Sequence, residues 1–263
     1  MHNVSSLTRK SAMSAGLALL LAACGGSRPQ VVSSSAQSPA GIELIGVSFA
    51  ETPTGHSPQS ISIAVPDGVH PGDLLVASVL GLYTQPNHPI EPPQGWEKID
   101  QVVHMGSYWR VATDGEPKSY AWSFGLRPIQ QWSGFILAYR GAKSLAAAAG
   151  WPSCQLASDA VCRGMAQNVP NPECESGGCQ ALTLPKPQAP VDSGLLIGIW
   201  WAHLTAGSLT PPTGLETIMS RQSGLVVVTA AQGPWEDARN ETIQATPARP
   251  NWVRGISQLL ILH

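Results

Sequence analysis

The sequence predicts an all-β protein, an antiparallel β-sandwich of jelly-roll type that is built from two related halves. From residue 42 to the end, short apolar or alternating segments are separated by Gly, Pro, Asn and Asp, as in strands joined by turns. The chain contains 26 glycines and 23 prolines but only 12% charged residues, a composition common in turn-rich extracellular β proteins. The segment "PPQGWEKI" at 92–99 returns as "PPTGLETI" at 211–218.

The N-terminus predicts export and a lipid anchor. Arg9 and Lys10 precede an apolar run, residues 12–22, that is too short to be a permanent membrane helix. The run leads into Leu21-Ala22-Ala23-Cys24, which resembles the lipobox of bacterial lipoproteins. The resemblance implies that residues 1–23 are a cleaved signal peptide and that Cys24 carries the lipid; an ordinary secretory signal is the alternative. An N-terminus with three acyl chains is anchored stably, whereas a protein with a single acyl chain binds a membrane only marginally.

The residues after Cys24 indicate where the domain is held. The residue directly after the cysteine is Gly25 and not an aspartate. The same resemblance to lipoproteins therefore implies the outer membrane if the cell envelope is Gram-negative. Residues 24–41 are rich in Ser, Gly, Pro and Gln and have little to bury, which predicts a flexible tether. About 17 such residues span roughly 23 Å.

The charge of the chain argues against a nucleic-acid partner. Loss of Arg9 and Lys10 with the leader leaves 13 basic and 17 acidic residues, a formal charge of −4. The Lys and Arg residues are scattered singly, so neither the basic face of a nucleic-acid binder nor a polybasic patch for lipid headgroups is predicted.

In the first half of the domain the pattern predicts six strands. We expect them at 42–49, 60–65, 74–82, 107–112, 119–124 and 133–141. The fourth and fifth are expected to form a hairpin around Asp114-Gly115-Glu116-Pro117. In the fifth, Tyr120, Trp122 and Phe124 share one face at a period of two, so these three side chains are predicted to point into the core.

The second half repeats this order. Strands are expected at 193–204, 224–233, 241–246 and 252–263, and the alanine run within 142–150 is the one place where a helical turn or two is expected. Proline cannot donate to a β ladder, so each Pro-Pro-x-Gly reads as a rigid exit from a strand into a turn. Each half has an apolar face that it cannot bury alone, and we therefore expect both halves to close on one core.

Five motifs in this order resemble a jelly-roll-like module found in secreted bacterial proteins and in phage tail or fibre proteins. They are Gly72-Asp73-Leu74-Leu75-Val76-Ala77, Pro92-Pro93-Gln94-Gly95-Trp96, Tyr108-Trp109-Arg110-Val111-Ala112, Tyr120-Ala121-Trp122-Ser123-Phe124 and Ala138-Tyr139-Arg140-Gly141. The resemblance covers residues 42–263 apart from one insertion. It implies a fold and a display or binding role, with no shared catalytic residues.

The insertion, at about residues 145–180, contains all the remaining cysteines: Cys154, Cys162, Cys174 and Cys179. In an exported protein an even number of clustered cysteines predicts disulfides. Three connectivities are open, of which sequential pairing is preferred here. Zinc is the competing interpretation, but the spacing lacks a Cys-x-x-Cys knuckle. We expect a loop held by two disulfides.

The candidate ligand contacts are one arginine and four tryptophans. Trp151 and Arg163 lie in the insertion, which is the first candidate for a contact surface; a stapled cover over one end of the sandwich is the alternative. Trp132, Trp235 and Trp252 border polar loop residues and are expected at the surface, where an indole stacks on a sugar ring or contacts a protein partner. The tryptophans within strand patterns are assigned to the core: Trp96, Trp109, Trp122 and Trp200.

No catalytic, metal or cofactor constellation is recognisable in the sequence. Gly-x-Ser-x-Gly is absent, and the histidines lack His-x-His or His-Glu-x-x-His spacing. The carboxylates of Asp67, Asp73, Asp114 and Asp237 are expected to cap turns, and a calcium site built from such turns stays open.

These observations predict an exported, lipid-anchored, non-enzymatic binding module of the cell envelope that presents its loops to a glycan or to another envelope or extracellular protein. A self-associating structural or fibre-like surface subunit is one alternative. A carbohydrate-active hydrolase or lyase is the other, and two acidic residues close together in a groove would favour it.

Overall fold

The computed structural model describes residues 41–53, 58–82, 89–102, 104–124, 130–154, 181–187, 191–203, 206–248 and 254–263. All of them belong to one compact unit that extends from Ser35 to His263. The predicted signal peptide, Cys24 and the tether to residue 40 lie outside the described residues. The unit is mostly β and its sheets are antiparallel, as predicted.

The first half, residues 41–143, forms two layers. Its five-stranded sheet has the order β1-β7-β3-β5-β4, with β1 Glu43–Glu51, β7 Gln131–Arg140, β3 Leu74–Leu82, β5 Met105–Val111 and β4 Glu97–Val102. A second layer is the pair β2 Ser60–Ala64 and β6 Ser119–Ser123.

The second half, residues 144–263, repeats both layers. Its five-stranded sheet has the order β12-β13-β10-β15-β8, with β12 Glu216–Ser223, β13 Val226–Pro234, β10 Leu195–His203, β15 Arg254–Leu262 and β8 Leu145–Cys154. The outer layer has the order β11-β14-β9, with β11 Leu209–Thr210, β14 Gln244–Pro247 and β9 Leu182–Thr183. A short helix, α2 Trp235–Ala238, follows β13 directly.

The two halves match strand for strand. The order β1-β7-β3-β5-β4 corresponds to β8-β15-β10-β13-β12, in which each strand takes the same place in the chain order of its half. Even the irregularities recur. The β4 register shifts between Lys98 and Asp100, and the β12 register shifts between Thr217 and Met219, at the same distance after the Pro-Pro-x-Gly turn. The halves are therefore two copies of one structural unit.

The repeated turn has one geometry in both copies. The backbone N–H of Trp96 donates to the carbonyl of Pro93 over 3.2 Å, and that of Leu215 donates to the carbonyl of Pro212 over 3.3 Å. Gly95 and Gly214 occupy the third turn position with φ of 84° and 92°. Since a type II turn requires positive φ at this position, glycine is needed there in each copy.

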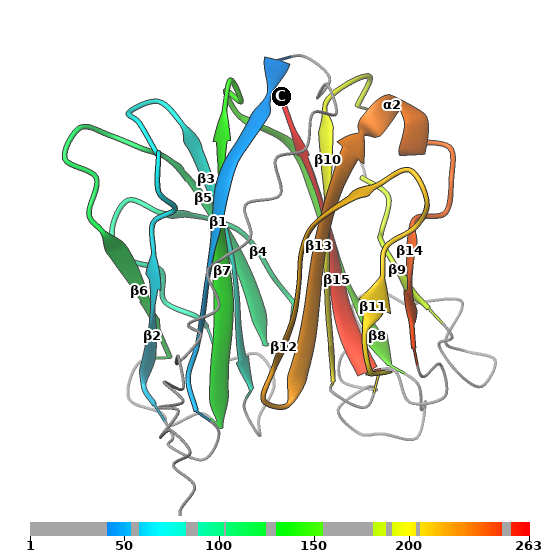
Figure 1. Cartoon of the computed structure of the whole chain (residues 1–263), viewed down its shortest axis with the longest axis horizontal. Coiled ribbons are helices and arrows are strands. Elements are labelled where there is room, and N and C mark those ends of the chain that lie inside the picture. The colour runs from blue at the N-terminus through cyan, green and yellow to red at the C-terminus, as the bar shows by residue number, and fades with distance from the viewer. Residues whose placement is uncertain are drawn as a thin grey trace, which may run out of the picture. The chain divides into compact units, whose positions relative to one another are not determined.

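The halves share a core, and each also has one of its own. The shared cluster lies between the two five-stranded sheets, where the rings of Phe135 and Trp201 stack at 5.9 Å. Separate clusters lie under β2 and β6 and under the sheet of β9, β11 and β14. Figure 1 shows the four layers in turn, from β2 and β6 on one side to β9, β11 and β14 on the other. The expected common interior is present, but it is one of three clusters of buried side chains among the described residues.

Polar side chains also join the two sheets. The indole Nε1 of Trp201 donates to Ser78 Oγ over 3.0 Å, and Ser107 is hydrogen-bonded to Gln258. These groups are fully buried, so the bonds between them specify how the sheets are paired.

The inward orientation predicted for the three aromatic residues is confirmed, while the predicted hairpin is wrong. Tyr120, Trp122 and Phe124 are 6%, 0% and 7% exposed and belong to the cluster under β2 and β6. However, β5 pairs with β3 and β4, whereas β6 pairs with β2. The chain crosses between layers at residues 112–118, because only the outer layer lets the aromatic face of β6 cover the outer face of the five-stranded sheet.

The insertion begins later than predicted. Residues 145–154, which were expected to belong to it, form β8, and the alanine run within them is extended, with no helical turn. In the first half β1 pairs with β7, and β8 pairs with β15 at the equivalent edge of the second half. The backbone groups of β15 on that side are thereby hydrogen-bonded. Cys154 is the last residue of β8. Cys162, Cys174 and Cys179 lie outside the described residues, and the disulfides stay a prediction.

Candidate functional site

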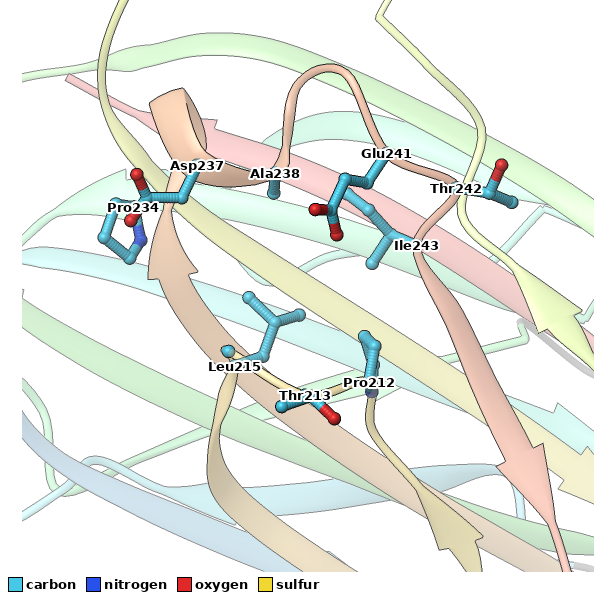
Figure 2. Close-up of a pocket in the computed structure, with 10 residues that line it drawn as sticks. Pro212, Thr213, Leu215, Pro234, Asp237, Ala238, Glu241, Thr242 and Ile243 are labelled. Carbon is cyan, nitrogen blue, oxygen red and sulfur yellow. The ribbon is translucent and has the colours of Figure 1, made fainter.

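A pocket lies between the second Pro-Pro-x-Gly turn and the segment that follows β13. Its volume is about 130 Å³. Figure 2 shows the side chains around it, which come from two stretches of the second half: Pro212, Thr213, Gly214 and Leu215 on one side, and Pro234, Asp237, Ala238, Glu241, Thr242 and Ile243 on the other.

Local sequence explains why the chain arches over the turn at this point. The indole of Trp235 is 4% exposed, and its Nε1 donates to the carbonyl of Val191 over 2.7 Å. Its backbone N–H donates to the carbonyl of Gly194 over 3.0 Å. With α2 fixed by this buried indole, the N–H of Glu241 donates to the carbonyl of Ala238 over 3.0 Å and closes the next turn. Residues 238–243 are thereby held above Leu215.

The pocket is apolar with an acidic rim. Pro212, Leu215 and Ile243 supply carbon surface, and no Lys, Arg or His is among its lining residues. Asp237 and Glu241 are exposed to solvent. Figure 2 shows the carboxylate of Glu241 turned across the pocket toward Leu215, while that of Asp237 lies beside Pro234. Such a site suits a cation on an apolar stem.

The corresponding place in the first half is filled. The residue after the turn glycine is Trp96 in the first half and Leu215 in the second. Arg110 and Gly233 occupy equivalent positions in the two halves. Arg110 pairs with Leu75, the second residue of β3, and Gly233 pairs with Leu196, the second residue of β10. A tryptophan and an arginine are therefore replaced by a leucine and a glycine, which leaves the second half open.

In the first half these large side chains close on one another. Arg110 Nη2 lies 3.3 Å from Glu116 Oε2, and its guanidinium carbon lies 4.9 Å from the centre of the Tyr120 ring. The Trp96 ring packs edge-on against Tyr120 with the ring centres 5.2 Å apart. The side chains of Arg110 and Glu116 are each only 12% exposed, so the first half fills this place with its own residues.

The expectation that Trp132 and Trp235 lie at the surface is wrong. Trp132 is 0% exposed, its Nε1 donates to the carbonyl of Pro58 over 3.1 Å, and its ring lies 4.7 Å from that of Phe124. It is buried because β7 lies between β1 and β3, with its outer face covered by the β2 and β6 layer. Trp235 is 4% exposed, and its indole is bonded to the carbonyl of Val191 as described above.

The remaining predicted contacts are placed in part or not at all. The backbone of Trp151 lies in β8 opposite Ser257. Arg163 and Trp252 lie outside the described residues. Sequence reasoning treated Asp237 as a turn residue only and missed Glu241 and Leu215. The usable signal was the unequal residue after the repeated glycine, Trp96 against Leu215.

The other turn carboxylates and the histidines form no metal centre in the described residues. Asp73 is 3% exposed and accepts hydrogen bonds from Arg140 and from the backbone N–H of His70. Burial lowers the pKa of His104 to about 4, so this imidazole is neutral at pH 7. Among the described residues, no three His, Cys, Asp or Glu side chains converge as a metal site, and no helix is long and apolar enough to cross a membrane.

No protein-family model matches this chain, and neither a curated protein nor a solved structure matches it. The two halves of the chain are therefore the reference for each other. Compared in this way, the turn is common to both, the closing side chains belong to the first half, and the pocket belongs to the second.

Proposed function

We propose that the protein is an exported, lipid-anchored, non-enzymatic binding module that holds an envelope or extracellular protein through the loops of its second half. The observation that carries this proposal is the pocket between Pro212–Leu215 and Pro234–Ile243, set on a rigid β framework at a place that the first half fills with its own side chains. Binding residues are commonly found on loops that a rigid framework positions.

A protein partner is favoured over a glycan. Glycan recognition was expected to use surface tryptophans, but the indoles of Trp132 and Trp235 are buried in the fold. The pocket itself offers carbon surface and carboxylates, which match a side chain of a protein more closely than a sugar ring.

The anchor is proposed from the lipobox Leu21-Ala22-Ala23-Cys24, with residues 24–41 as the tether and the outer membrane as the location in a Gram-negative cell. Growth with radiolabelled palmitate tests this part. The label is expected on the full chain and absent from Cys24→Ser, and an unlabelled full chain would contradict the lipid anchor.

We further propose that each half is a jelly-roll-like unit and that Cys154, Cys162, Cys174 and Cys179 form two disulfides. The alternation of strands between an inner and an outer layer supports the first point. In the first half, β1 and β3 lie in the five-stranded sheet with β2 in the other layer between them in the chain, and β5 and β7 lie in that sheet with β6 in the other layer between them. Such a change of layer from strand to strand supports a jelly-roll-like unit. The resemblance of the five sequence motifs to modules of secreted and phage tail or fibre proteins also supports it.

A carbohydrate-active hydrolase is the second candidate, because two acidic residues, Asp237 and Glu241, line one pocket. The size of the pocket argues against it. At about 130 Å³, it is smaller than the roughly 300–1,000 Å³ of typical ligand pockets. A pocket of this size does not enclose a glycosidic bond with a sugar ring on each side.

The full chain, purified in detergent and immobilised, tests the binding function against envelope extracts and against a glycan array. We expect a protein to be retained, and its retention to be lost in Leu215→Trp or when residues 155–180 are deleted. Retention that is equal in all three chains would contradict the assignment to these loops. Release of reducing sugar that Glu241→Gln abolishes would support the hydrolase instead.

A further inference from the structure

We infer that the pocket of the second half receives the guanidinium of an arginine side chain presented by the partner protein. This inference rests on the proposed binding function and names the chemistry of its contact. Its support is a comparison of the two halves, in which the first half holds a guanidinium of its own at the same place.

The first half provides the template. The Arg110 guanidinium lies beside the turn that contains Gly95, with Nη1 at 3.3 Å from the position that a Cβ on that glycine would take. Glu116 supplies the carboxylate, with its Oε2 3.3 Å from Arg110 Nη2. A planar guanidinium is thus held between a Pro-Pro-x-Gly turn and a glutamate, a pairing that favours arginine over lysine.

The second half keeps the turn and the glutamate. The backbone N–H of Val65 donates to the carbonyl of Lys118, and the N–H of Leu184 donates to the carbonyl of Ile243. These bonds align Lys118 with Ile243. Two residues earlier in each half is a glutamate, Glu116 in the first and Glu241 in the second, so the carboxylate is present at both sites.

The second half has no arginine at the position equivalent to Arg110, and a side chain does not fit there. Gly233 stands where Arg110 stands in the first half. A Cβ on Gly233 would lie 2.6 Å from Leu215 Cδ2 and 3.2 Å from the carbonyl oxygen of Gly214. A side chain at this position is therefore excluded by the pocket wall, and a cation that meets Glu241 has to enter from outside.

The lining matches an arginine side chain along its whole length. Pro212, Leu215 and Ile243 offer carbon surface to its methylene groups, while the carboxylate of Glu241 faces its charged end. No basic residue among the lining residues competes for this carboxylate. Hydrogen bonds between a guanidinium and a carboxylate are roughly twice as strong as those between neutral groups.

The test titrates the full chain with the tripeptide Ac-Gly-Arg-Gly-NH2 and with the matched citrulline and lysine peptides, by isothermal calorimetry at low salt. We expect weak binding of the arginine peptide and at least tenfold weaker binding of the neutral citrulline isostere. Lysine is expected to bind several-fold more weakly than arginine. Citrulline or lysine binding that equals that of arginine would overturn the inference.

Variants locate the contact. Glu241→Gln, at an exposed position, is expected to weaken arginine binding about tenfold, and Leu215→Trp, which restores the first-half residue, is expected to abolish it. Glu97→Gln removes the same charge from an exposed position on β4 and is expected to change nothing. Equal binding by Glu241→Gln and the unaltered chain would overturn the inference, even if Leu215→Trp failed to fold.

The two proposals fail in different ways. If the chain retains a protein partner that Leu215→Trp releases, but the arginine peptide does not bind, the guanidinium assignment is wrong and the binding function stands. If the peptide binds as expected but no protein is retained by the immobilised chain, the guanidinium site stands and the proposed function is wrong.

Discussion

The Arg140 guanidinium binds the Asp73 carboxylate through two hydrogen bonds, from Nε to Oδ1 over 3.0 Å and from Nη2 to Oδ2 over 2.8 Å. Arg140 ends β7 and Asp73 precedes β3, so the pair joins two neighbouring strands at one end of the sheet. Nη2 also donates to the carbonyl of Gly68 over 3.0 Å. The motifs Gly72-Asp73 and Tyr139-Arg140-Gly141, which are far apart in the sequence, are thus parts of one contact.

Because of this pair, the free energy of unfolding is expected to fall at low pH. Burial alone raises the pKa of Asp73, but the hydrogen bonds from Arg140 and the His70 N–H, with the charge of Arg140, outweigh it and hold the pKa below its ordinary value of 3.8. The contribution is therefore complete above pH 3.8 and is lost as the pH falls through the lower folded value. Chemical denaturation between pH 6 and 2 is expected to show this loss in the native chain. Asp73→Asn is expected to be less stable at pH 6 and to lose less on acidification; an identical pH slope in both chains would contradict the role of the pair.

His104 is expected to act in a different pH range. Burial lowers its pKa from 6.5 to about 4, so the unfolded chain takes up this proton at a higher pH than the folded one. Its stabilising contribution is present above pH 6.5 and falls away between 6.5 and 4. His104→Gln is expected to flatten the stability profile in that interval only, as followed by urea unfolding at half-unit steps of pH. The same flattening below pH 4 would show that another group titrates.

The turn glycines are expected to tolerate alanine unequally. Alanine at a positive φ costs about 1–2 kcal/mol for the left-handed backbone alone. At Gly214 a Cβ meets no atom within 4 Å, so Gly214→Ala is expected to lower the free energy of unfolding by that amount. At Gly95 the new Cβ would lie 3.3 Å from Arg110 Nη1, so Gly95→Ala is expected to cost more. Equal losses in guanidinium chloride unfolding would contradict the difference between the two sites.

The aromatic face of β6 is expected to contribute much of the stability of the first half. Trp122 is 0% exposed and lies within 5.2 Å of Trp96, ring centre to ring centre. Trp122→Ala removes a fully buried indole, and a loss of about 3–5 kcal/mol in the free energy of unfolding is expected. Val111→Ala is the control, because this side chain is 42% exposed and its loss is expected to stay within about 0.5 kcal/mol. A small effect at Trp122 would show that the outer layer contributes little.

Local patterns predicted the strands well, because alternation is a property of a few consecutive residues. Tyr120, Trp122 and Phe124 show a period of two, and all three point inward. The pairing of β6 was missed because its partner β2 lies about sixty residues earlier, while the Asp114-Gly115 turn beside it has the composition of a hairpin. Local sequence therefore predicted the strand but not its neighbour.

The surface assignment of Trp132 failed for a different reason. Its polar neighbours Gln131 and Ser133 indicated a loop, yet both are 1% exposed. Gln131 Nε2 donates to the carbonyl of Ser223 over 2.8 Å, and the Oγ atoms of Ser133 and Ser223 lie 2.7 Å apart, which satisfies these groups between the two sheets. Polar residues were buried through a partner about ninety positions away, which a local pattern does not show.

The pocket was not predicted because it arises where equivalent positions of the two halves carry different residues. The sequence showed that the Pro-Pro-x-Gly turn recurs, but the consequence of Leu215 in place of Trp96 depends on Gly233 and Glu241, which the fold brings to the same point. Each of these residues is unremarkable alone. Only the alignment of the two halves through their strand pairing shows that the glutamate is retained and the arginine is lost.

The central claim is that the second half is open where the first half is closed, and the most direct measurement is methyl NMR of the full chain titrated with Ac-Gly-Arg-Gly-NH2. We expect the methyl signals of Leu215 and Ile243 to shift with the peptide, while the indole N–H signal of Trp96, followed in a 1H–15N spectrum, stays unchanged. Shifts of equal size in both halves, or none at Leu215 and Ile243, would contradict the claim.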